Sequence, residues 1–276
     1  MSRISEVFAS LSKDGEGAYI PYICAGDPDK DFTVSLAGGL LKAGADMIEL
    51  GIPFSDPVAD GPVIQGAMSR SLEGGFKVPG TFEVVEAIRR KGFEQPIVLM
   101  TYSNPVLRMG LDRFCANASK SGADAVLLVD MPLEESSQLD AQAGKRGLDV
   151  IRMVAPSTTD ERLAEIVSRG SGFVYAVSDS GVTGARVSIS ESAKSLLSRA
   201  VRASNLPVVL GFGISTPRHV REALMAGANG VVEGTALASI YGPLLAVREH
   251  AIEEAARHAA AMKASTPLIR AHGRDE

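Results

Sequence analysis

The chain has 276 residues, with 28 glycines, two cysteines, four histidines and no tryptophan, and this length suits one large α/β domain or two small ones. Hydrophobic residues make up 45% and charged residues 22%, which is typical of a globular protein and argues against a disordered chain. The net charge of −5 argues against nucleic acid or an anionic membrane as the main partner.

Short apolar runs recur along the whole chain, and their starts advance by about 30 residues, the size of one strand-and-helix unit. Nearly continuous apolar strands predict a parallel sheet that is covered on both faces. Residues 1–13 predict an extra helix before the first strand, and residues 265–276 predict a polar, frayed tail after a single domain of residues 1–264. In chain order, the predicted strands are Ala18–Ala25, Met47–Leu50, Pro96–Thr101, Asp124–Asp130, Asp149–Val154, Gly172–Ser178, Pro207–Leu210 and Asn229–Gly234.

The predicted junctions from helix to strand resemble one another. In each, a glycine that ends a helix is followed two residues later by Asp or Asn and then by an apolar strand; these glycines are Gly44, Gly122, Gly147 and Gly227. Eight repeated units predict a (β/α)₈ TIM barrel. A doubly wound open sheet is the alternative, which is weakened because no Gly-x-Gly-x-x-Gly motif follows the first strand.

Residue counts argue against several kinds of chemistry. Cys24 and Cys115 lie far apart, which disfavours a disulfide framework or a structural zinc site and fits the cytoplasm. All four histidines follow residue 218, so a Ser-His-Asp hydrolase and a histidine-based metal centre are both disfavoured. No lysine lies in a predicted strand, which disfavours a Schiff-base aldolase. No apolar stretch is long enough to cross a membrane.

Carboxylates occur where the predicted strands end, which is the end at which barrel enzymes carry their active sites. Glu49 lies inside an apolar strand, where an ionised group is costly unless it is paired or functional, so we expect a functional role. Asp60, taken alone, is more readily interpreted as the N-cap of a helix from Val63 than as a catalyst. Beside Glu49, however, it would form a pair of carboxylates with different protonation roles. Asp56 is interpreted as a turn residue, and Asp130 as the cap of a helix that begins after Pro132.

Glycine-rich loops follow the last three predicted strands, at residues 180–184, 211–215 and 234–235. Backbone N–H groups in such loops bind phosphate, although plain turn formation is the alternative. Further side chains at the strand ends would line a pocket for a flat organic group, or else belong to the barrel core: Tyr22, Met100, Leu127, Tyr175 and Phe212. The residues together favour acid–base chemistry by carboxylates on a phosphorylated small molecule.

Several segments are similar to one known family. They are Pro21–Pro28 (PYICAGDP), Glu49–Pro62 (ELGIPFSDPVADGP), Pro96–Pro105 (PIVLMTYSNP), Gly181–Ala185 (GVTGA) and Gly211–Pro217 (GFGISTP). In this order they resemble the tryptophan synthase α subunits, and the resemblance covers residues 15–245, nearly the whole chain.

The resemblance implies a (β/α)₈ barrel that cleaves indole-3-glycerol phosphate to indole and glyceraldehyde 3-phosphate without a metal or a cofactor of its own. It implies that Glu49 is the general acid–base, that Asp60 binds the indole N–H, and that Tyr175 positions the substrate. The side chains implied to contact the indole are Tyr22, Met100, Leu127 and Phe212. The residues implied to bind the phosphate are Gly184, Gly213, Gly234 and Thr235. Thr183 would contact Asp60 when a loop of residues 178–190 closes.

The resemblance also implies a partner, because this family passes indole to a β subunit that carries pyridoxal phosphate, within an α₂β₂ complex. The loop Pro53–Pro62 and the segment around Asn104 and Pro132 would face that partner. Two alternatives stay open: a stand-alone lyase that releases free indole, and a catalytically silent barrel that regulates a partner.

Three residues depart from the family pattern. Asp179 replaces an arginine in the closing loop. This reversal of charge could alter coupling to the β subunit, so the stand-alone lyase stays open as an alternative. Glu233 replaces a small or apolar residue beside the phosphate loops, and we expect it to face away from them. Thr235 replaces a serine and keeps the hydroxyl group.

Overall fold

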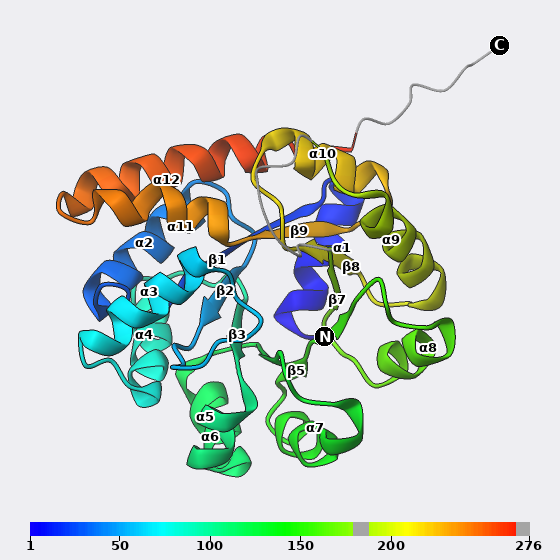
Figure 1. The fold of residues 1–276 in the computed structure, drawn as a ribbon, viewed down its shortest axis with the longest axis horizontal. Helices are drawn as coiled ribbons and strands as arrows, with labels where there is room; N and C mark the ends of the chain where they lie inside the picture. The colour runs from blue at the N-terminus through cyan, green and yellow to red at the C-terminus, as the bar shows by residue number, and fades with distance from the viewer. Residues whose placement is uncertain (179–187, 269–276) are drawn as a thin grey trace.

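The computed structural model describes residues 1–178 and 188–268, and it places parallel strands at the centre of a ring of helices (Figure 1). Within these residues the strands form one sheet in the order β5-β4-β3-β2-β1-β9-β8-β7-β6. The strands are β1 (Ala18–Cys24), β2 (Ile48–Gly51), β3 (Ile97–Thr101), β4 (Ala125–Leu128), β5 (Asp149–Val150), β6 (Arg152–Val154), β7 (Val174–Val177), β8 (Val208–Gly211) and β9 (Gly230–Glu233).

The sheet closes through the fifth predicted strand, which the structure divides at Ile151. Its first part, β5, pairs with β4, and its second part, β6, pairs with β7, so one continuous segment joins the two edges of the sheet. The Ile151 N–H still donates to the carbonyl of Val126 on the β4 side. The barrel prediction is therefore confirmed, and the open-sheet alternative is wrong.

Helices cover the outer face of the barrel. They are α1 (Arg3–Asp14), α2 (Lys30–Lys42), α3 (Pro62–Glu73), α4 (Val78–Arg90), α5 (Ser103–Met109), α6 (Leu111–Ser121), α7 (Ser137–Gly144), α8 (Asp160–Ser168), α9 (Glu191–Ala203), α10 (Pro217–Met225), α11 (Thr235–Tyr241) and α12 (Arg248–Lys263), with 3₁₀ turns at Leu133–Glu135 and Gly242–Leu244. The expected extra helix is α1. Its Phe8 ring packs edge-on against Phe173, which precedes β7, so α1 covers the N-terminal end of the barrel.

The repeated junctions form as predicted, and their Asp and Asn side chains also form hydrogen bonds to the backbone of neighbouring strands. The four junction glycines all have positive φ angles, between 69° and 103°: Gly44, Gly122, Gly147 and Gly227. Three of the side chains that follow them accept an N–H from the first or second residue of another strand: Asp46 from Tyr19, Asp124 from Ile97 and Asn229 from Val208. These bonds satisfy backbone donors that the ladder leaves free, so the N-terminal end of the barrel is fully paired at those points.

The C-terminal segment differs from the expectation of a tail frayed from residue 265. Thr266 is fully buried, and its carbonyl accepts the N–H of Gly17. Leu268 donates to the carbonyl of Gly15, with a single antiparallel bridge between Glu16 and Pro267. The expectation is wrong for residues 265–268, because backbone pairing with the loop after α1 holds them; residues 269–276 lie outside the described part. Among residues 1–178 and 188–268, no helix combines the length and the apolar character needed to cross a membrane.

Candidate active site

Glu49 occupies the interior of the barrel, in the middle of β2. Its side chain is only 2% exposed, and neither carboxyl oxygen has a hydrogen-bond partner among the described residues. Burial, and then the nearby charge of Asp60, raise the pKa of Glu49 to about 8. Glu49 is therefore predominantly protonated at neutral pH, and its proton is available to a molecule bound inside the barrel.

Asp60 lies near Glu49 in the loop between β2 and α3. Its Oδ2 accepts a 2.6 Å hydrogen bond from the hydroxyl of Tyr102, which in turn accepts the N–H of Ala59 at 3.0 Å. Burial raises the pKa of Asp60, and the hydrogen bond from Tyr102 opposes that rise. The site thus holds two carboxyl groups in different environments, which is how one pocket assigns an acid role and an anionic role.

The preference for Asp60 as a helix N-cap is wrong. The N-cap of α3 is Gly61, with no side-chain cap bond, and the helix begins with Pro62, which has no N–H group to satisfy. The Asp60 side chain is turned instead toward Tyr102. Sequence reasoning missed Tyr102, although it directly follows β3 and so lies at a strand end, within the segment Pro96–Pro105.

Two other carboxylates have structural roles; that of Asp56 is the expected one, and the helix that Asp130 caps is not the expected one. Asp56 lies in a turn, where its carbonyl accepts the N–H of Val58. Asp130 accepts both the N–H and the hydroxyl of Ser103, at 2.7 and 2.8 Å, so it caps the start of α5. The sequence had assigned this cap to the segment after Pro132, which lies on the other side of Asp130 in the chain.

Two glycines at strand ends make space for tyrosine rings inside the barrel. A Cβ atom on Gly51 would lie 2.1 Å from the Tyr22 hydroxyl, and one on Gly211 would lie 2.2 Å from the Tyr175 hydroxyl. Both rings are buried, and burial is the main cause that raises the pKa of each tyrosine, with smaller contributions from Glu49 and Asp60. The structure therefore brings both tyrosines beside the two carboxyl groups.

The expected apolar contacts extend around the same interior surface. Met100 is paired in register with both Gly51 and Leu127, and Met100 and Leu127 are both buried. Phe212 packs edge-on against Tyr175 at a centroid distance of 6.2 Å. The backbone φ of Phe212 is 65°, a left-handed conformation that costs a non-glycine residue about 1 kcal/mol. In this conformation the ring lies against Tyr175.

The expected phosphate-binding residues lie at two adjacent strand ends. β8 and β9 are paired neighbours, with Leu210 in register with Val231. Gly213 follows β8, and Gly234 and Thr235 follow β9; in the described part of the chain their N–H groups donate to no protein acceptor. Free N–H groups in two neighbouring turns form a suitable cradle for an anion. Thr183, Gly184 and Asp179 lie outside the described residues.

Glu233, the last residue of β9, lies on the helix side of the sheet. Its carboxylate binds Tyr19 of β1 and His258 of α12. The expectation that it faces away from the phosphate loops is confirmed.

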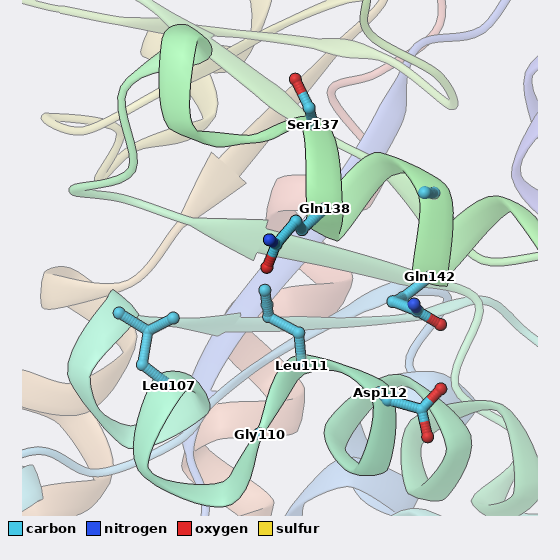
Figure 2. Close-up of a pocket in the computed structure, with 8 residues that line it drawn as sticks. Leu107, Gly110, Leu111, Asp112, Ser137, Gln138 and Gln142 are labelled. Carbon is cyan, nitrogen blue, oxygen red and sulfur yellow. The ribbon is translucent and has the colours of Figure 1, made fainter.

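A surface pocket of about 570 Å³ lies apart from this site, between α5, α6 and α7. Leu111 and Gln138 point toward one another across it (Figure 2). None of the described candidate residues lines it, so we do not assign it to the substrate. Among residues 1–178 and 188–268, no cluster of His, Cys, Asp and Glu side chains has the arrangement of a metal site.

The chain is similar to one family along nearly its whole length. The profile of the family described as tryptophan synthase alpha chain matches residues 8–267. The tryptophan synthase alpha chain of Methanosarcina acetivorans is 47% identical over 86% of this chain and 86% of its own length. A structure of Mycobacterium tuberculosis tryptophan synthase has a TM-score of 0.88 at 36% identity and covers 97% of this chain and 99% of its own. One from Pyrococcus furiosus, described as concerning mutual activation of the tryptophan synthase α₂β₂ complex, has a TM-score of 0.84 at 44% identity, with coverages of 90% and 98%.

The burial of Glu49 predicts a dependence of stability on pH. Between pH 4.5, the ordinary pKa of Glu, and about pH 8, the folded chain holds a proton that the unfolded chain has released. In that window this group lowers the free energy of unfolding by about 1.4 kcal/mol per pH unit as the pH rises. We therefore expect Glu49→Gln to be more stable than wild type by about 3 kcal/mol at pH 7, and the difference to vanish toward pH 4.5.

Urea unfolding at several pH values measures this difference. Glu83→Gln is the control, because Glu83 is exposed on α4 and its substitution should give no such trend. A difference between Glu49→Gln and wild type that stays constant from pH 5 to pH 8 would contradict the raised pKa.

Proposed function

The chain belongs to the tryptophan synthase alpha chain family, and on that premise we propose that it cleaves indole-3-glycerol phosphate to indole and glyceraldehyde 3-phosphate. The observation that carries this proposal is Glu49: a buried carboxyl group with no hydrogen-bond partner among the described residues, with a pKa of about 8, beside a second carboxylate. A retro-aldol cleavage needs one group that first gives a proton and then takes one back, and Glu49 has the properties of such a group.

In the proposed mechanism, protonated Glu49 first transfers its proton to the indole ring carbon that carries the side chain. The ring then bears a positive charge, which Asp60 stabilises by accepting a hydrogen bond from the indole N–H. Glu49, now a carboxylate, removes the proton of the adjacent side-chain hydroxyl, and the carbon–carbon bond breaks. Its electron pair returns to the ring, which releases indole and the aldehyde and restores the proton on Glu49. Proton transfer of this kind contributes about 10²–10⁴-fold to the rate.

Other residues of the site would bind the substrate. The indole ring would lie against the apolar interior formed by Tyr22, Met100, Leu127 and Phe212, with Tyr175 positioning it beside Glu49. The phosphate would accept the N–H groups of Gly213, Gly234 and Thr235, together with the Thr235 hydroxyl. The roles of Thr183 at Asp60 and of Gly184 at the phosphate rest on the resemblance to the family alone.

We expect no cofactor in this chain, because Glu49 and Asp60 supply both the proton transfers and the charge stabilisation. The resemblance to the family implies that pyridoxal phosphate is carried by the β partner. The unpaired, buried cysteines Cys24 and Cys115 fit a reducing compartment, and we assign the chain to the cytoplasm.

We further propose that the chain binds a β subunit in an α₂β₂ complex, the assembly named for the Pyrococcus furiosus structure. Two apolar side chains are exposed in the segments that should face this partner: Val58, which is 84% exposed in the loop before α3, and Leu107, which is 54% exposed on α5. Exposed apolar groups at the catalytic end of the barrel are suitable interface residues. The stand-alone lyase and the silent regulatory barrel have no such support.

Replacing Glu49 tests the reaction. With the β partner present, we expect Glu49→Gln to lower kcat for indole release at least about 100-fold, because glutamine cannot donate the proton. Wild-type kcat/KM should fall as the pH rises through about 8, where Glu49 loses its proton. The exposed Glu83→Gln variant serves as the control; unchanged indole release by Glu49→Gln would remove Glu49 from the mechanism.

Replacing Tyr102 tests the environment of Asp60. The hydrogen bond from Tyr102 lowers the pKa of Asp60, so its loss in Tyr102→Phe should raise that pKa. We expect the acid limb of the pH profile of kcat/KM to move to higher pH, while the plateau falls less than about tenfold, because Asp60 is ionised on the plateau with or without Tyr102. An acid limb that stays in place would show that the anion it reports is not Asp60.

Replacing Val58 tests the partner surface. We expect Val58→Asp to weaken association with the β subunit at least about tenfold, because a charge would have to be buried at the interface. Met225→Asp is the matched control, since Met225 is also 84% exposed but lies at the end of α10, on the opposite end of the barrel. Sedimentation measures both; equal affinities for the two variants would locate the interface elsewhere.

A further inference from the structure

Glu233 combines complete burial with a position next to the proposed phosphate-binding turn. Its exposure is 0%, and it immediately precedes Gly234. Oε2 accepts a 2.6 Å hydrogen bond from the Tyr19 hydroxyl, and Oε1 lies 2.7 Å from Nε2 of His258. A buried carboxylate is costly unless it is hydrogen-bonded, and here both oxygens are engaged by different elements of the fold.

The two sides of the β9 end are fixed by different neighbours. Glu233 points toward the helices, while a Cβ atom on Gly234 would lie 3.3 Å from Cδ1 of Tyr22, inside the barrel. Successive residues of a strand face opposite sides, so the peptide that joins Glu233 to Gly234 has a contact on each side. Its orientation sets the direction of the Gly234 N–H directly, and it affects the Thr235 N–H, which belongs to the next peptide, through the position of Gly234.

Tyr19 links this carboxylate to a second anchor of α12. Its hydroxyl binds Glu233, and its backbone N–H donates to Asp46 at 2.8 Å. Asp46 pairs with Lys263, five residues after His258 on α12, which lies over the β1 and β9 side of the barrel (Figure 1). Burial and the charge of Glu233 raise the pKa of Tyr19 well above its usual value, so Tyr19 stays protonated and remains the donor.

We propose that Glu233 is a positioning residue for the phosphate of the substrate. Tyr19 and His258 hold its carboxylate on the helix side of β9, which keeps this negative group away from the anion and fixes the N–H groups of Gly234 and Thr235 toward it. The positioning role rests on the proposed function, because it requires that the phosphate of the substrate binds at these N–H groups. Hydrogen bonds weaken steeply when donors are misaligned, so a freed Glu233 would cost phosphate affinity without touching the reacting atoms.

The test separates the phosphate from the rest of the substrate. The variants are Tyr19→Phe and His258→Ala, each of which removes one partner of Glu233, and His258→Gln, which restores a donor. We expect Tyr19→Phe and His258→Ala to raise the KM for indole-3-glycerol phosphate about tenfold while kcat changes less than about twofold. Calorimetry should show the same loss for an indole-alkyl phosphate and no loss for the corresponding indole-alkyl alcohol. His258→Gln should recover most of the affinity.

Tyr241→Phe is the matched control. Tyr241 is also buried, and it also donates to a carboxylate, that of Asp27, but it does not touch Glu233. It lies on α11, which begins at Thr235, so a general loosening of that helix would appear in this variant. We expect its affinity for the phosphate ester to match that of wild type.

The outcomes distinguish two failures. A wild-type protein that releases no indole would refute the proposed function. Two results in an active wild-type background would overturn the role of Glu233 alone. In the first, Tyr19→Phe loses as much affinity for the alcohol as for the phosphate ester. In the second, Tyr19→Phe loses no more affinity for the phosphate ester than Tyr241→Phe does. A fall in kcat at unchanged KM would overturn it as well.

Discussion

The burial of the Glu49 carboxyl group, in the barrel interior with no partner among the described residues, is the constraint around which the catalytic end is arranged. Ionisation of this group is costly there because no donor of residues 1–178 or 188–268 replaces the water that it has lost. Gly51 and Gly211 contribute by leaving space for the rings of Tyr22 and Tyr175, which fill the interior beside it. The raised pKa thus follows from packing first and from the charge of Asp60 second.

Two buried carboxyl groups, one toward each end of the barrel, have opposite environments. At the N-terminal end, Asp124 accepts bonds from Arg3, Arg89 and the N–H of Ile97, so it is fully satisfied. At the catalytic end, Glu49 is left without a partner in the described structure. The hydrogen-bonded Asp124 contributes to stability, whereas the unpartnered Glu49 lowers the free energy of unfolding at neutral pH, as functional groups commonly do. The parallel strands separate the two groups, because every strand starts at one end of the barrel and ends at the other.

The sequence predicts the features that depend on local pattern. Strand positions and the helix stop at Gly44 follow from apolar periodicity and from the need for a positive φ, and both are confirmed. The hydrogen bond between Tyr102 and Asp60 joins residues 42 positions apart, so no local pattern contains it. For that reason the residues around Asp60, taken alone, favoured a cap role, and only the proximity of Glu49 in the predicted fold indicated a carboxylate pair. The partners of Glu233 are equally remote: the sequence predicted that Glu233 faces away from the phosphate loops, but not what holds it there.

One raised pKa serves both halves of the proposed reaction. Because Glu49 is protonated near neutral pH, it begins as an acid strong enough to protonate the ring once Asp60 stabilises the resulting charge. After that transfer, Glu49 is an anion in an apolar site, and the environment that disfavours its charge makes it a strong base toward the side-chain hydroxyl. A solvent-exposed Glu, ionised at neutral pH, would begin without the proton and end as a weak base. The site therefore does not need a histidine from the first 218 residues, since burial raises the pKa of a carboxyl group to about 8, where it can both donate and accept a proton near neutral pH.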